Sequence, residues 1–484
     1  MPPLHAPTLR RRRAGSPSLR WWIWTGIFTL GGLGIRLGTV FGRPNRQPGD
    51  DAYYYHYAAN LLVEGKGFIN PWYWNAYHEH IQIAAWPPLF VFVLAMTSVV
   101  GLKSFFAHRI WCCIVGAAAI VMTALAGREI AGRRVGLLAA FLVAVYPNIW
   151  MSDELALSET ISPLLIAFVL WASYRFWKRP SWQRAVVLGV GIALTALARD
   201  ELTALAVLII LPVTLFIAKV RWSRRLAFCG LALLAFAAVI APWVGYNMSR
   251  FKDPVFITDG LGTTLASADC AQTWSGTGEG YWSYACQQAA SPAHWTDESV
   301  RNNIALHHAL KFIEAHKNRW IPVALAKIGR GFGFFHPMQQ IKLDSTIETR
   351  PYHWALVGLG MYYVLFALSI GGTVVLWRRK IPVWPLLAIG VNVVAAMVVA
   401  FGNTRYRTPF EVSLVLLAAV QLEWIWSRLS RRRRSFVGAS GDGGAGERSL
   451  GEGALGTDAP ALPGVPDHPD GGSIQIRSPL AGGH

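Results

Sequence analysis

The sequence carries little charge for its length. Only 15% of its 484 residues are Asp, Glu, Lys or Arg, whereas a soluble domain has roughly 25%. Apolar residues make up 53% of the chain, and the mean hydropathy is +0.34. So few charges could not cover that much apolar surface in water, which excludes a disordered chain, a disulfide-rich secreted module and most soluble enzymes. The composition predicts a polytopic membrane protein.

Cysteine and the common catalytic motifs are also scarce. The chain has five cysteines, and their spacing matches no zinc site. The sequence has no convincing Gly-rich phosphate loop, dinucleotide-binding fingerprint or nucleophile triad. Cys270 and Cys286 lie in one predicted outer loop. On an oxidising side of the membrane they could pair, and the sequence leaves that pairing open.

Long apolar stretches predict an all-α fold of about ten transmembrane helices, because stretches of about 15 to 25 apolar residues can cross a hydrocarbon core. The predicted spans are 21–41, 109–127, 134–150, 159–177, 184–198, 202–219, 225–245, 353–377, 382–401 and 408–427. The segment 86–101 contains Pro87-Pro88, and we predict it as a juxtamembrane or re-entrant helix. Whether this segment crosses the membrane stays open.

The net charge of +18 comes from 45 basic and 27 acidic residues. Basic residues occur in short clusters between the apolar stretches rather than on one face of a domain, which argues against a nucleic-acid partner. Lys and Arg are enriched in cytoplasmic loops of membrane proteins. Both termini are therefore predicted to be cytoplasmic, with these clusters on the same side: 10–20, 128–134, 175–184, 219–225, 378–380 and 428–434.

This topology divides the chain into five regions. They are a basic cytoplasmic arm (1–20), a transmembrane module (21–245) with a first outer loop (42–108), a partly helical extracytoplasmic loop domain (246–352), C-terminal transmembrane helices (353–430) and a disordered cytoplasmic tail (431–484). The first apolar stretch follows a basic arm and lacks a small-residue cleavage site, so we expect it to be retained as an anchor.

Two acids, Asp50 and Asp51, follow the first predicted span. Acids at the start of a helix are favoured by the helix dipole, which is a structural interpretation of the pair. A carboxylate at the membrane surface could instead take a proton from an acceptor hydroxyl or hold a metal. We select both residues as candidate catalytic groups.

Further charged residues lie at the outer ends of other spans. Ionisable groups near the bilayer are costly and usually face a cavity or a partner. Arginine also presents a planar fork that suits phosphate oxygens. Helix-terminal, turn and interfacial roles explain several of these residues equally well. The candidate acids are Asp153, Glu154 and Glu159, and the candidate phosphate-binding residues are Arg199, Arg405 and Arg407.

Several motifs occur in the order found in one family of membrane enzymes. The chain resembles the GT-C superfamily of integral-membrane glycosyltransferases over about 40–430, and within it glycosyltransferase family 39, which includes protein O-mannosyltransferases and the lipid A aminoarabinose transferase. The residues that carry the resemblance are Gly49-Asp50-Asp51-Ala52-Tyr53-Tyr54 with Ala58 and Gly65, Trp86-Pro87-Pro88-Leu89-Phe90, Gly101 through His108-Arg109, Gly132-Arg133-Arg134 with Pro147, Leu157-Ser158-Glu159-Thr160, Ala196-Leu197-Ala198-Arg199, Pro242-Trp243 with Asn247, and Arg405-Tyr406-Arg407-Thr408-Pro409.

The resemblance implies roles for the candidate residues. Asp50 matches the family's first-loop Asp, the catalytic base or acceptor-positioning group, with Asp51 beside it. Asp153, Glu154 and Glu159 are candidates for a second acid that holds a metal or the acceptor. Many members carry an acid-Lys pair before the double Pro, where this chain has Ala85-Trp86, so Arg199, Arg405 or Arg407 would bind the donor phosphate instead.

The resemblance also implies a function: transfer of a monosaccharide, a hexose or a pentose, from a polyprenyl-phosphate donor to an extracytoplasmic protein, lipid or glycan. A divalent cation, Mg²⁺ or Mn²⁺, is an open expectation. The location implied is a bacterial inner membrane, with the active site on the extracytoplasmic side. The alternative is a transporter or flippase of a lipid-linked envelope precursor, although the sequence shows no inverted repeat.

Overall fold

The computed structural model describes residues 18–291 and 297–441. Within those residues, helices are the only regular elements apart from one isolated bridge between Ile69 and Gln82. The chain divides into two compact units, Met1–Arg428 and Leu429–His484. Helix α18 (Thr408–Gly441) continues into the second unit, and the remainder of the predicted tail lies outside the described residues, as does most of the predicted N-terminal arm.

Seven helical segments in the described part of the chain are long and apolar enough to cross a membrane. An α-helix satisfies its own backbone hydrogen bonds, so such runs can enter lipid. They are α1 (Leu19–Phe41), α5 (Phe105–Ala131), Ser158–Lys178 with α8 (Ser162–Lys178), Asp200–Ile217, α10 (Trp222–Met248), α16 (Tyr352–Arg378) and Thr404–Ser430, which joins a 3₁₀ turn (Thr404–Arg407) to the first part of α18. Each coincides with a predicted span.

The remaining predicted spans are broken or short. Helices α6 (Arg133–Val145) and α7 (Pro147–Leu155) meet at a 50° bend and form an eighth candidate if they are one span. Extended backbone at Tyr146 separates them, and Pro147 starts the new helix because its missing N–H costs nothing there. Helices α9 (Trp182–Ala198) and α17 (Trp384–Val399) have 17 and 16 residues. They occupy the other two predicted spans, so the count of ten stays a prediction.

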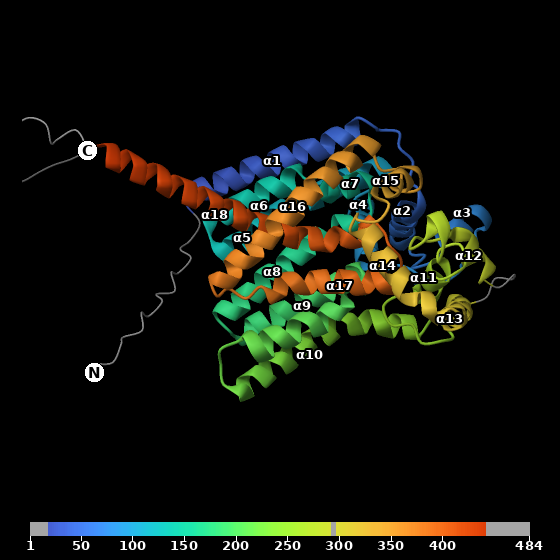
Figure 1. The fold of residues 1–484 in the computed structure, drawn as a ribbon. Helices are drawn as coiled ribbons and strands as arrows, with labels where there is room; N and C mark the ends of the chain where they lie inside the picture. Colours follow the sequence, from blue (N-terminus) through green and yellow to red (C-terminus); the bar gives the residue numbers. More distant parts are fainter. Residues whose placement is uncertain (1–17, 292–296, 442–484) are drawn as a thin grey trace, which may run out of the picture. The chain divides into compact units, whose positions relative to one another are not determined.

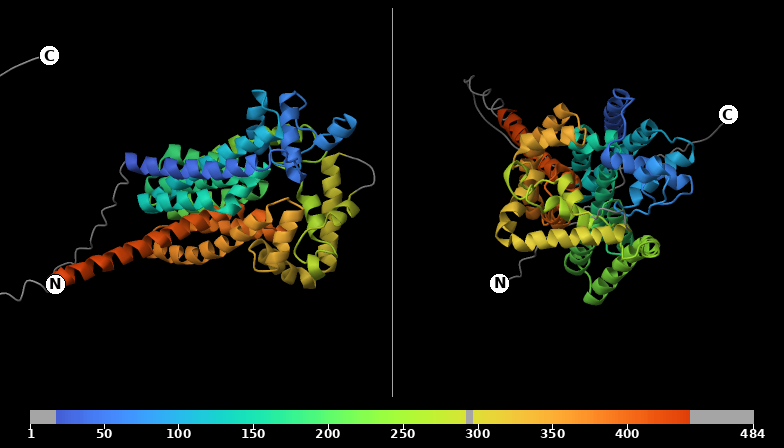
Figure 2. Two further views of the ribbon diagram at one scale, coloured as in Figure 1. Left: turned by 90° about the horizontal axis from the view of Figure 1, so that it is seen from above. Right: turned by 90° about the vertical axis from the view of Figure 1, so that its right-hand side faces the viewer.

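The residues of the two large predicted outer segments, 42–108 and 246–352, lie at one end of the bundle, here called the loop end (Figures 1 and 2). The first contributes α2 (Asp50–Val63), α3 (Pro71–Tyr77) and α4 (Leu89–Val99). The second is partly helical, as predicted. It contributes α11 (Leu261–Ala268), α12 (Tyr284–Ala289), α13 (Glu298–Ala315), α14 (Trp320–Gly331) and α15 (Pro337–Thr346).

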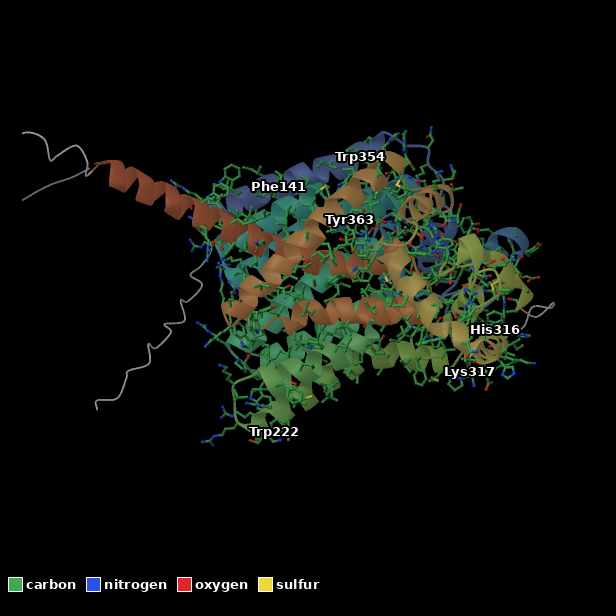
Figure 3. The ribbon with its side chains drawn as sticks, viewed as in Figure 1. Phe141, Trp222, His316, Lys317, Trp354 and Tyr363 are labelled. Carbon is green, nitrogen blue, oxygen red and sulfur yellow. A yellow bond between two sulfur atoms is a disulfide. The ribbon has the colours of Figure 1, made fainter. Side chains whose placement is uncertain are left out.

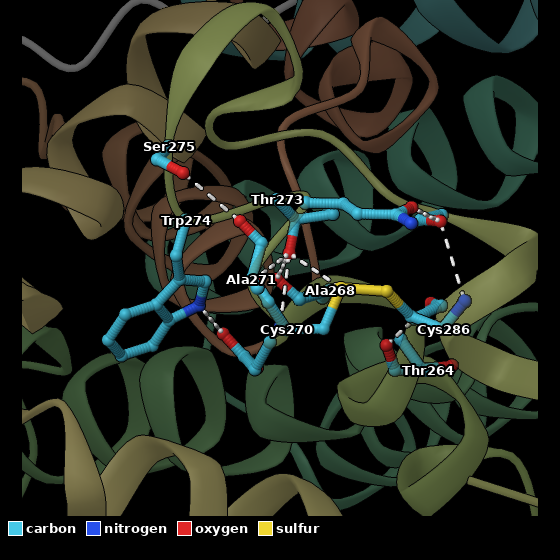
Figure 4. The surroundings of a disulfide bond; sticks show 12 residues. Thr264, Ala268, Cys270, Ala271, Thr273, Trp274, Ser275 and Cys286 are labelled. Atoms are coloured by element: carbon cyan, nitrogen blue, oxygen red, sulfur yellow. Dashed lines mark hydrogen bonds between the residues drawn. A yellow bond between two sulfur atoms is a disulfide. The ribbon is translucent and has the colours of Figure 1, made fainter. Parts of the chain in front are cut away.

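A disulfide joins Cys270 and Cys286 in this second segment (Figure 4). Thr273 and Trp274 lie beside it, and the Trp274 indole N–H donates to Asp269 Oδ1 at 2.9 Å. Asp269 also pairs with Lys327 Nζ of α14 at 2.8 Å. The pairing that the sequence left open therefore forms, and it is part of a packed region.

The core of the bundle depends on close helix contacts. A Cβ at Gly372 of α16 would lie 1.9 Å from the Leu417 carbonyl oxygen of α18, and one at Gly189 of α9 would lie 2.1 Å from the Ala232 carbonyl oxygen of α10. Only glycine fits at either contact, as is common where membrane helices pack closely. Large apolar side chains such as Phe141, Trp354 and Tyr363 are exposed on the outside of the bundle (Figure 3), as a lipid-facing surface requires.

Candidate functional site

Asp51 lies near the start of α2 at the loop end. Gly49 is extended, and the helix begins immediately after it. Asp51 Oδ1 accepts a hydrogen bond from Trp86 Nε1 at 3.1 Å, and Oδ2 pairs with Arg405 Nη2 at 2.7 Å. Asp50 is the first residue of the same helix, but its side chain lies outside the part of the chain that the structure describes.

Arg405 joins Asp51 to a second carboxylate from another part of the sequence. It lies in a 3₁₀ turn, Thr404–Arg407, where its own backbone N–H donates to Asn403 Oδ1. Its Nε and Nη2 bond the two oxygens of Glu159 at 2.5 and 3.3 Å. Arg405 therefore bridges two carboxylates with one planar fork, a geometry that lysine cannot reproduce.

Glu159 in turn binds Arg199, so the contacts continue as a chain. Glu159 sits in the 3₁₀ turn before α8, and Arg199 follows the last residue of α9. Arg199 Nη1 lies 2.7 Å from Glu159 Oε1, and Arg199 Nε lies 2.5 Å from Glu201 Oε1. We call the series Asp51, Arg405, Glu159, Arg199 and Glu201 the ionic chain.

The ionic chain is partly exposed at both ends and buried in the middle. The side chains of Asp51 and Arg405 are 25% and 19% exposed and that of Glu201 is 19% exposed, whereas those of Arg199 and Glu159 are 8% and 0% exposed. A ligand that enters at the Asp51 end would thus meet Asp51 and Arg405 first. Buried charges need partners, and each member of the chain has at least one at ion-pair distance.

Glu348 adds a carboxylate at the edge of this cluster. Its Oε1 lies 4.0 Å from Arg405 Nη1 and accepts a hydrogen bond from Asn403 Nδ2 at 2.8 Å. Burial raises the pKa of the Glu348 carboxyl, while Arg350, at 3.1 Å from Oε2, favours the ionised form. Glu348 is not among the residues predicted from the sequence, because no motif or span end marks it within the loop domain.

Aromatic rings line the first loop beside Asp51. Trp86 stacks on Tyr54 with ring centroids 4.3 Å apart, and Tyr53 stacks on Trp72 at 5.4 Å. Trp86 therefore does two things: its ring packs on the loop, and its N–H is a neutral donor that holds Asp51.

Asp153 and Glu154 belong to other ion pairs. Asp153 Oδ2 lies 2.7 Å from Arg36 Nε of α1, and both side chains are buried. Glu154 Oε1 is approached by Arg46 at 2.7 Å, by Arg109 at 3.5 Å and by Arg43 at 3.7 Å. Of the three candidates for a second acid, Glu159 is the one in direct contact with the Asp51–Arg405 pair.

Arg407 points into the bundle. Its Nε lies 2.6 Å from Glu411 Oε1, its Nη1 donates to the Gly331 carbonyl at 3.1 Å, and its guanidinium lies 3.6 Å from the Tyr362 ring centroid. Its side chain is only 2% exposed. Arg405 and Arg407, although predicted as equivalent, thus have different surroundings.

The residues of the site do not fit a metal ion. Among the described residues, no three His, Cys, Asp or Glu side chains are grouped so that they could hold one. At the ionic chain, arginine guanidinium groups already occupy the carboxylates of Asp51 and Glu159. The carboxylate oxygens that a metal ion would need are therefore taken up by Arg405 and Arg199.

Comparison with known proteins gives one family and several structures. The family model described as dolichyl-phosphate-mannose-protein mannosyltransferase matches residues 85–246, about a third of the chain. This match includes Trp86, Glu159 and Arg199 but neither Asp51 nor Arg405. A search of the curated proteins finds no significant match.

The structural matches cover nearly the whole chain. The archaeal oligosaccharyltransferase AglB from Archaeoglobus fulgidus, in complex with an inhibitory peptide and a dolichol-phosphate, matches with a TM-score of 0.52 at 14% identity, covering 90% of this chain and 53% of that one. The same oligosaccharyltransferase in complex with Zn and sulfate has a TM-score of 0.50 at 14% identity, covering 84% and 50%. ArnT from Cupriavidus metallidurans, bound to undecaprenyl phosphate, has a TM-score of 0.42 at 12% identity, covering 84% and 78%. The chain thus spans about half the length of the oligosaccharyltransferase whose fold it shares.

Proposed function

We propose that this chain is a GT-C glycosyltransferase that transfers a monosaccharide from a polyprenyl-phosphate donor to an acceptor hydroxyl, and the family match over residues 85–246 and the shared fold support this. The observation that carries the proposal is the ionic chain. It brings Asp51, Glu159, Arg199 and Arg405, from four separate segments, to one place at the loop end. The archaeal neighbour that shares the fold binds a dolichol-phosphate, which supports a lipid-phosphate donor here.

The proposed step is a displacement at the anomeric carbon of the sugar. An aspartate takes the proton of the acceptor hydroxyl, and the hydroxyl oxygen forms a bond to the anomeric carbon. The bond from that carbon to the phosphate oxygen breaks, and the polyprenyl phosphate leaves with the electron pair. Arginine guanidinium groups placed at the leaving oxygen would stabilise the charge that develops there.

We assign the base to Asp50 and a positioning role to Asp51. Both carboxylate oxygens of Asp51 are already engaged, one by Trp86 and one by Arg405. A base must have an oxygen within hydrogen-bond reach of the proton that it removes. Asp51 therefore suits the orientation of Arg405, and Asp50 beside it remains the candidate for proton removal.

Arg405 is the proposed phosphate-binding residue, with Arg199 behind it. Arg405 is the more exposed of the two, and one guanidinium of fixed shape can bind a phosphate oxygen as it binds a carboxylate. Arg407 was the third candidate from the resemblance. Its pairing with Glu411 inside the bundle supports a role in packing instead.

Membrane reconstitution tests the function. Wild-type protein in proteoliposomes should transfer label from a radiolabelled polyprenyl-phosphate sugar, and Asp50→Asn should lose transfer by about 100-fold or more, because the amide cannot accept the proton. Glu314→Gln, an exposed carboxyl of α13, is the matched control and should keep wild-type transfer. Transfer by Asp50→Asn at the wild-type rate would remove Asp50 as the base.

The alternative function is transport or flipping of a lipid-linked precursor. The 50° bend between α6 and α7 favours it, because transporters often contain broken helices. A fluorescent polyprenyl-phosphate lipid in the same proteoliposomes separates the two functions. Protein-dependent movement of the lipid across the bilayer, without sugar transfer from any donor tested, would support the transporter.

We further propose that the protein acts in a bacterial inner membrane with its loop end on the extracytoplasmic side. The basic clusters at the other end of the bundle support this orientation, because Lys and Arg are enriched on the cytoplasmic side. The acceptor would be a protein, lipid or glycan that reaches the loop end, and either hexose or pentose fits the proposal. We derive no metal-dependent step.

A further inference from the structure

A cavity at the loop end lies between the end of α1, α7 and the start of α16. It has a volume of about 590 Å³ and is lined by residues that include Ile35, Gly38 and Arg43 of α1 and its end, Trp150 and Glu154 of α7, and Trp354 of α16. We call it the α1–α16 groove. None of these residues belongs to the ionic chain, so the inference below does not rest on the proposed function.

The bend between α6 and α7 explains why the groove exists. Since α7 turns away from α6 by 50°, α1 and α16 are not packed against a straight helix at this level. Gly38 leaves further space, because a Cβ added there would have no heavy atom within 4 Å. Ile35 and Trp354 are exposed at the sides of the groove. The walls are thus apolar and open toward lipid.

Positive charge exceeds negative charge around Glu154, at the end of the groove that Arg43 and Glu154 line. Three guanidinium groups, those of Arg43, Arg46 and Arg109, lie within 3.7 Å of the single carboxylate of Glu154. The neighbouring Asp153 does not offset them, because it is paired with Arg36. Arg109 Nη2 is buried and makes no hydrogen bond. The three arginines share one carboxylate, so two positive charges remain without a carboxylate partner next to the apolar groove.

The three arginines differ in how far a ligand could reach them. The side chain of Arg43 is 51% exposed, whereas those of Arg46 and Arg109 are 11% and 0% exposed. Arg46 is also held by Thr349, and Arg109 donates to the carbonyls of Glu154 and Arg43. Arg43 is thus the arginine free to turn toward an anion, and the other two supply a fixed positive field behind it.

We propose that the α1–α16 groove binds an anionic phospholipid of the leaflet at the loop end. The phosphate contacts Arg43, and an acyl chain lies along Ile35 and Trp354. Phosphate and guanidinium make charge-assisted hydrogen bonds, and these are stronger where water is scarce. Tryptophan at the edge of the groove suits the boundary between headgroups and acyl chains.

Native mass spectrometry of the full-length protein in a neutral detergent tests this site. The probes are phosphatidylglycerol and phosphatidylcholine with identical acyl chains, so that only the headgroup charge differs. We expect the wild type to retain one phosphatidylglycerol at about tenfold higher affinity than phosphatidylcholine. Arg43→Gln should weaken phosphatidylglycerol binding about tenfold, which corresponds to the loss of one charged hydrogen bond, and should abolish the headgroup preference.

A second variant tests the groove itself. Gly38→Leu would fill the open space and should weaken both lipids about tenfold without a clash in the protein. Gly26→Leu adds the same side chain elsewhere on α1, also with nothing near its Cβ, and Lys252→Gln removes an exposed cation of the loop domain. Both controls should bind as the wild type does, and thermal unfolding verifies that every variant is folded.

Two results would overturn the proposal. One is wild-type binding of phosphatidylglycerol by both Arg43→Gln and Gly38→Leu. The other is a clear preference of the same groove for undecaprenyl phosphate over phosphatidylglycerol, lost in the same two variants, which would assign the groove to a polyprenyl chain.

Discussion

Two residues far apart in the sequence set the charge beside Asp51. The indole N–H of Trp86 bonds Asp51 Oδ1 without adding charge. Arg405 supplies the cation from the far end of the sequence, at 2.7 Å from Asp51. The positive charge beside this acid therefore depends on a contact between the first loop and the last outer turn.

The two arginines of the Arg405-Tyr406-Arg407 motif should give opposite phenotypes when each is changed to lysine. Arg405→Lys should lower transfer by about 100-fold with little change in thermal stability, because a point charge cannot bridge Asp51 and Glu159 at a developing phosphate charge. Arg407→Lys should instead lower the unfolding temperature, because it leaves Glu411 and Gly331 without part of their buried hydrogen bonds.

The measurement for this pair is sugar transfer in proteoliposomes together with thermal unfolding of the same preparations. Each variant serves as the other's control, since both replace arginine by lysine within the same turn of the chain. Equal loss of transfer at unchanged stability in both variants would contradict the assignment, and it would return Arg407 to the phosphate site.

Most helices could be predicted from hydropathy, but their interruptions could not. The predicted span 134–150 covers α6 and the start of α7, and the bend at Tyr146 leaves no gap in the apolar run. Similarly, the span 202–219 contains π-helical turns at Ala206–Ile210 and Pro212–Ile217. Pro212 signals an irregularity because it lacks an N–H, but it does not say which turn results.

The residues of the candidate site, like the helices, could be predicted from local sequence, but the contacts between them could not. Motifs and span ends indicated Asp51, Glu159, Arg199 and Arg405 one by one, because charges near a bilayer are costly. Their joint contacts depend on how α2, α8, α9 and the Thr404–Arg407 turn meet, and no local pattern encodes that. For the same reason, Arg407 could not be separated from Arg405, nor Glu159 from Asp153.

Helix α13 should be docked more firmly at acidic pH. Its first residue, Glu298, accepts a hydrogen bond from Ala84 N at 2.7 Å, next to the segment that leads to Trp86. Burial raises the pKa of Glu298 from 4.5 to about 8. Burial and the charge of Asp297 likewise raise the pKa of Asp259 from 3.8 to about 6. A carboxyl with a raised pKa stabilises the fold fully below its unfolded value and loses that contribution as the pH rises through its folded value.

Hydrogen–deuterium exchange of α13 should therefore accelerate between pH 4.5 and pH 8, after correction for the intrinsic exchange rate. Glu298→Gln should flatten the part of this rise above about pH 6, because an amide does not ionise and its oxygen still accepts from Ala84 N. Glu314→Gln, on the same helix but 75% exposed, should keep the wild-type profile. An unchanged profile in Glu298→Gln would show that another group governs the docking.

In the molecule as a whole, the alternating direction of the helices determines where the basic residues behind the net charge of +18 lie. The basic clusters at 128–134, 175–184, 219–225 and 378–380 follow or precede helices that run toward the end opposite the loop end. Lys178 pairs with Glu129 at 3.1 Å, so the clusters 128–134 and 175–184 meet there, and Arg184 donates to the Arg175 carbonyl at 3.0 Å within the second of them. The excess charge is thus explained by topology, and the proposed transfer depends on the few ions at the loop end.

Helix α4 decides whether this alternation holds, and we predict that it does not cross the membrane. It has 11 residues, about 16 Å of helix, against a hydrocarbon core of about 30 Å. The chain that follows α4 returns to α2: Lys103 Nζ lies 3.1 Å from Glu64, and the Lys103 carbonyl accepts from Asn60 Nδ2 at 3.0 Å.

Cysteine labelling tests this prediction for α4. The cysteine of Lys103→Cys should react with a membrane-impermeant maleimide from the same side of the membrane as the cysteine of Lys252→Cys. Arg179→Cys should react only after permeabilisation. The free native cysteines among the described residues are buried and should give little background. Labelling of Lys103→Cys only after permeabilisation would show that α4 crosses, and would reverse the side assigned to every helix after it.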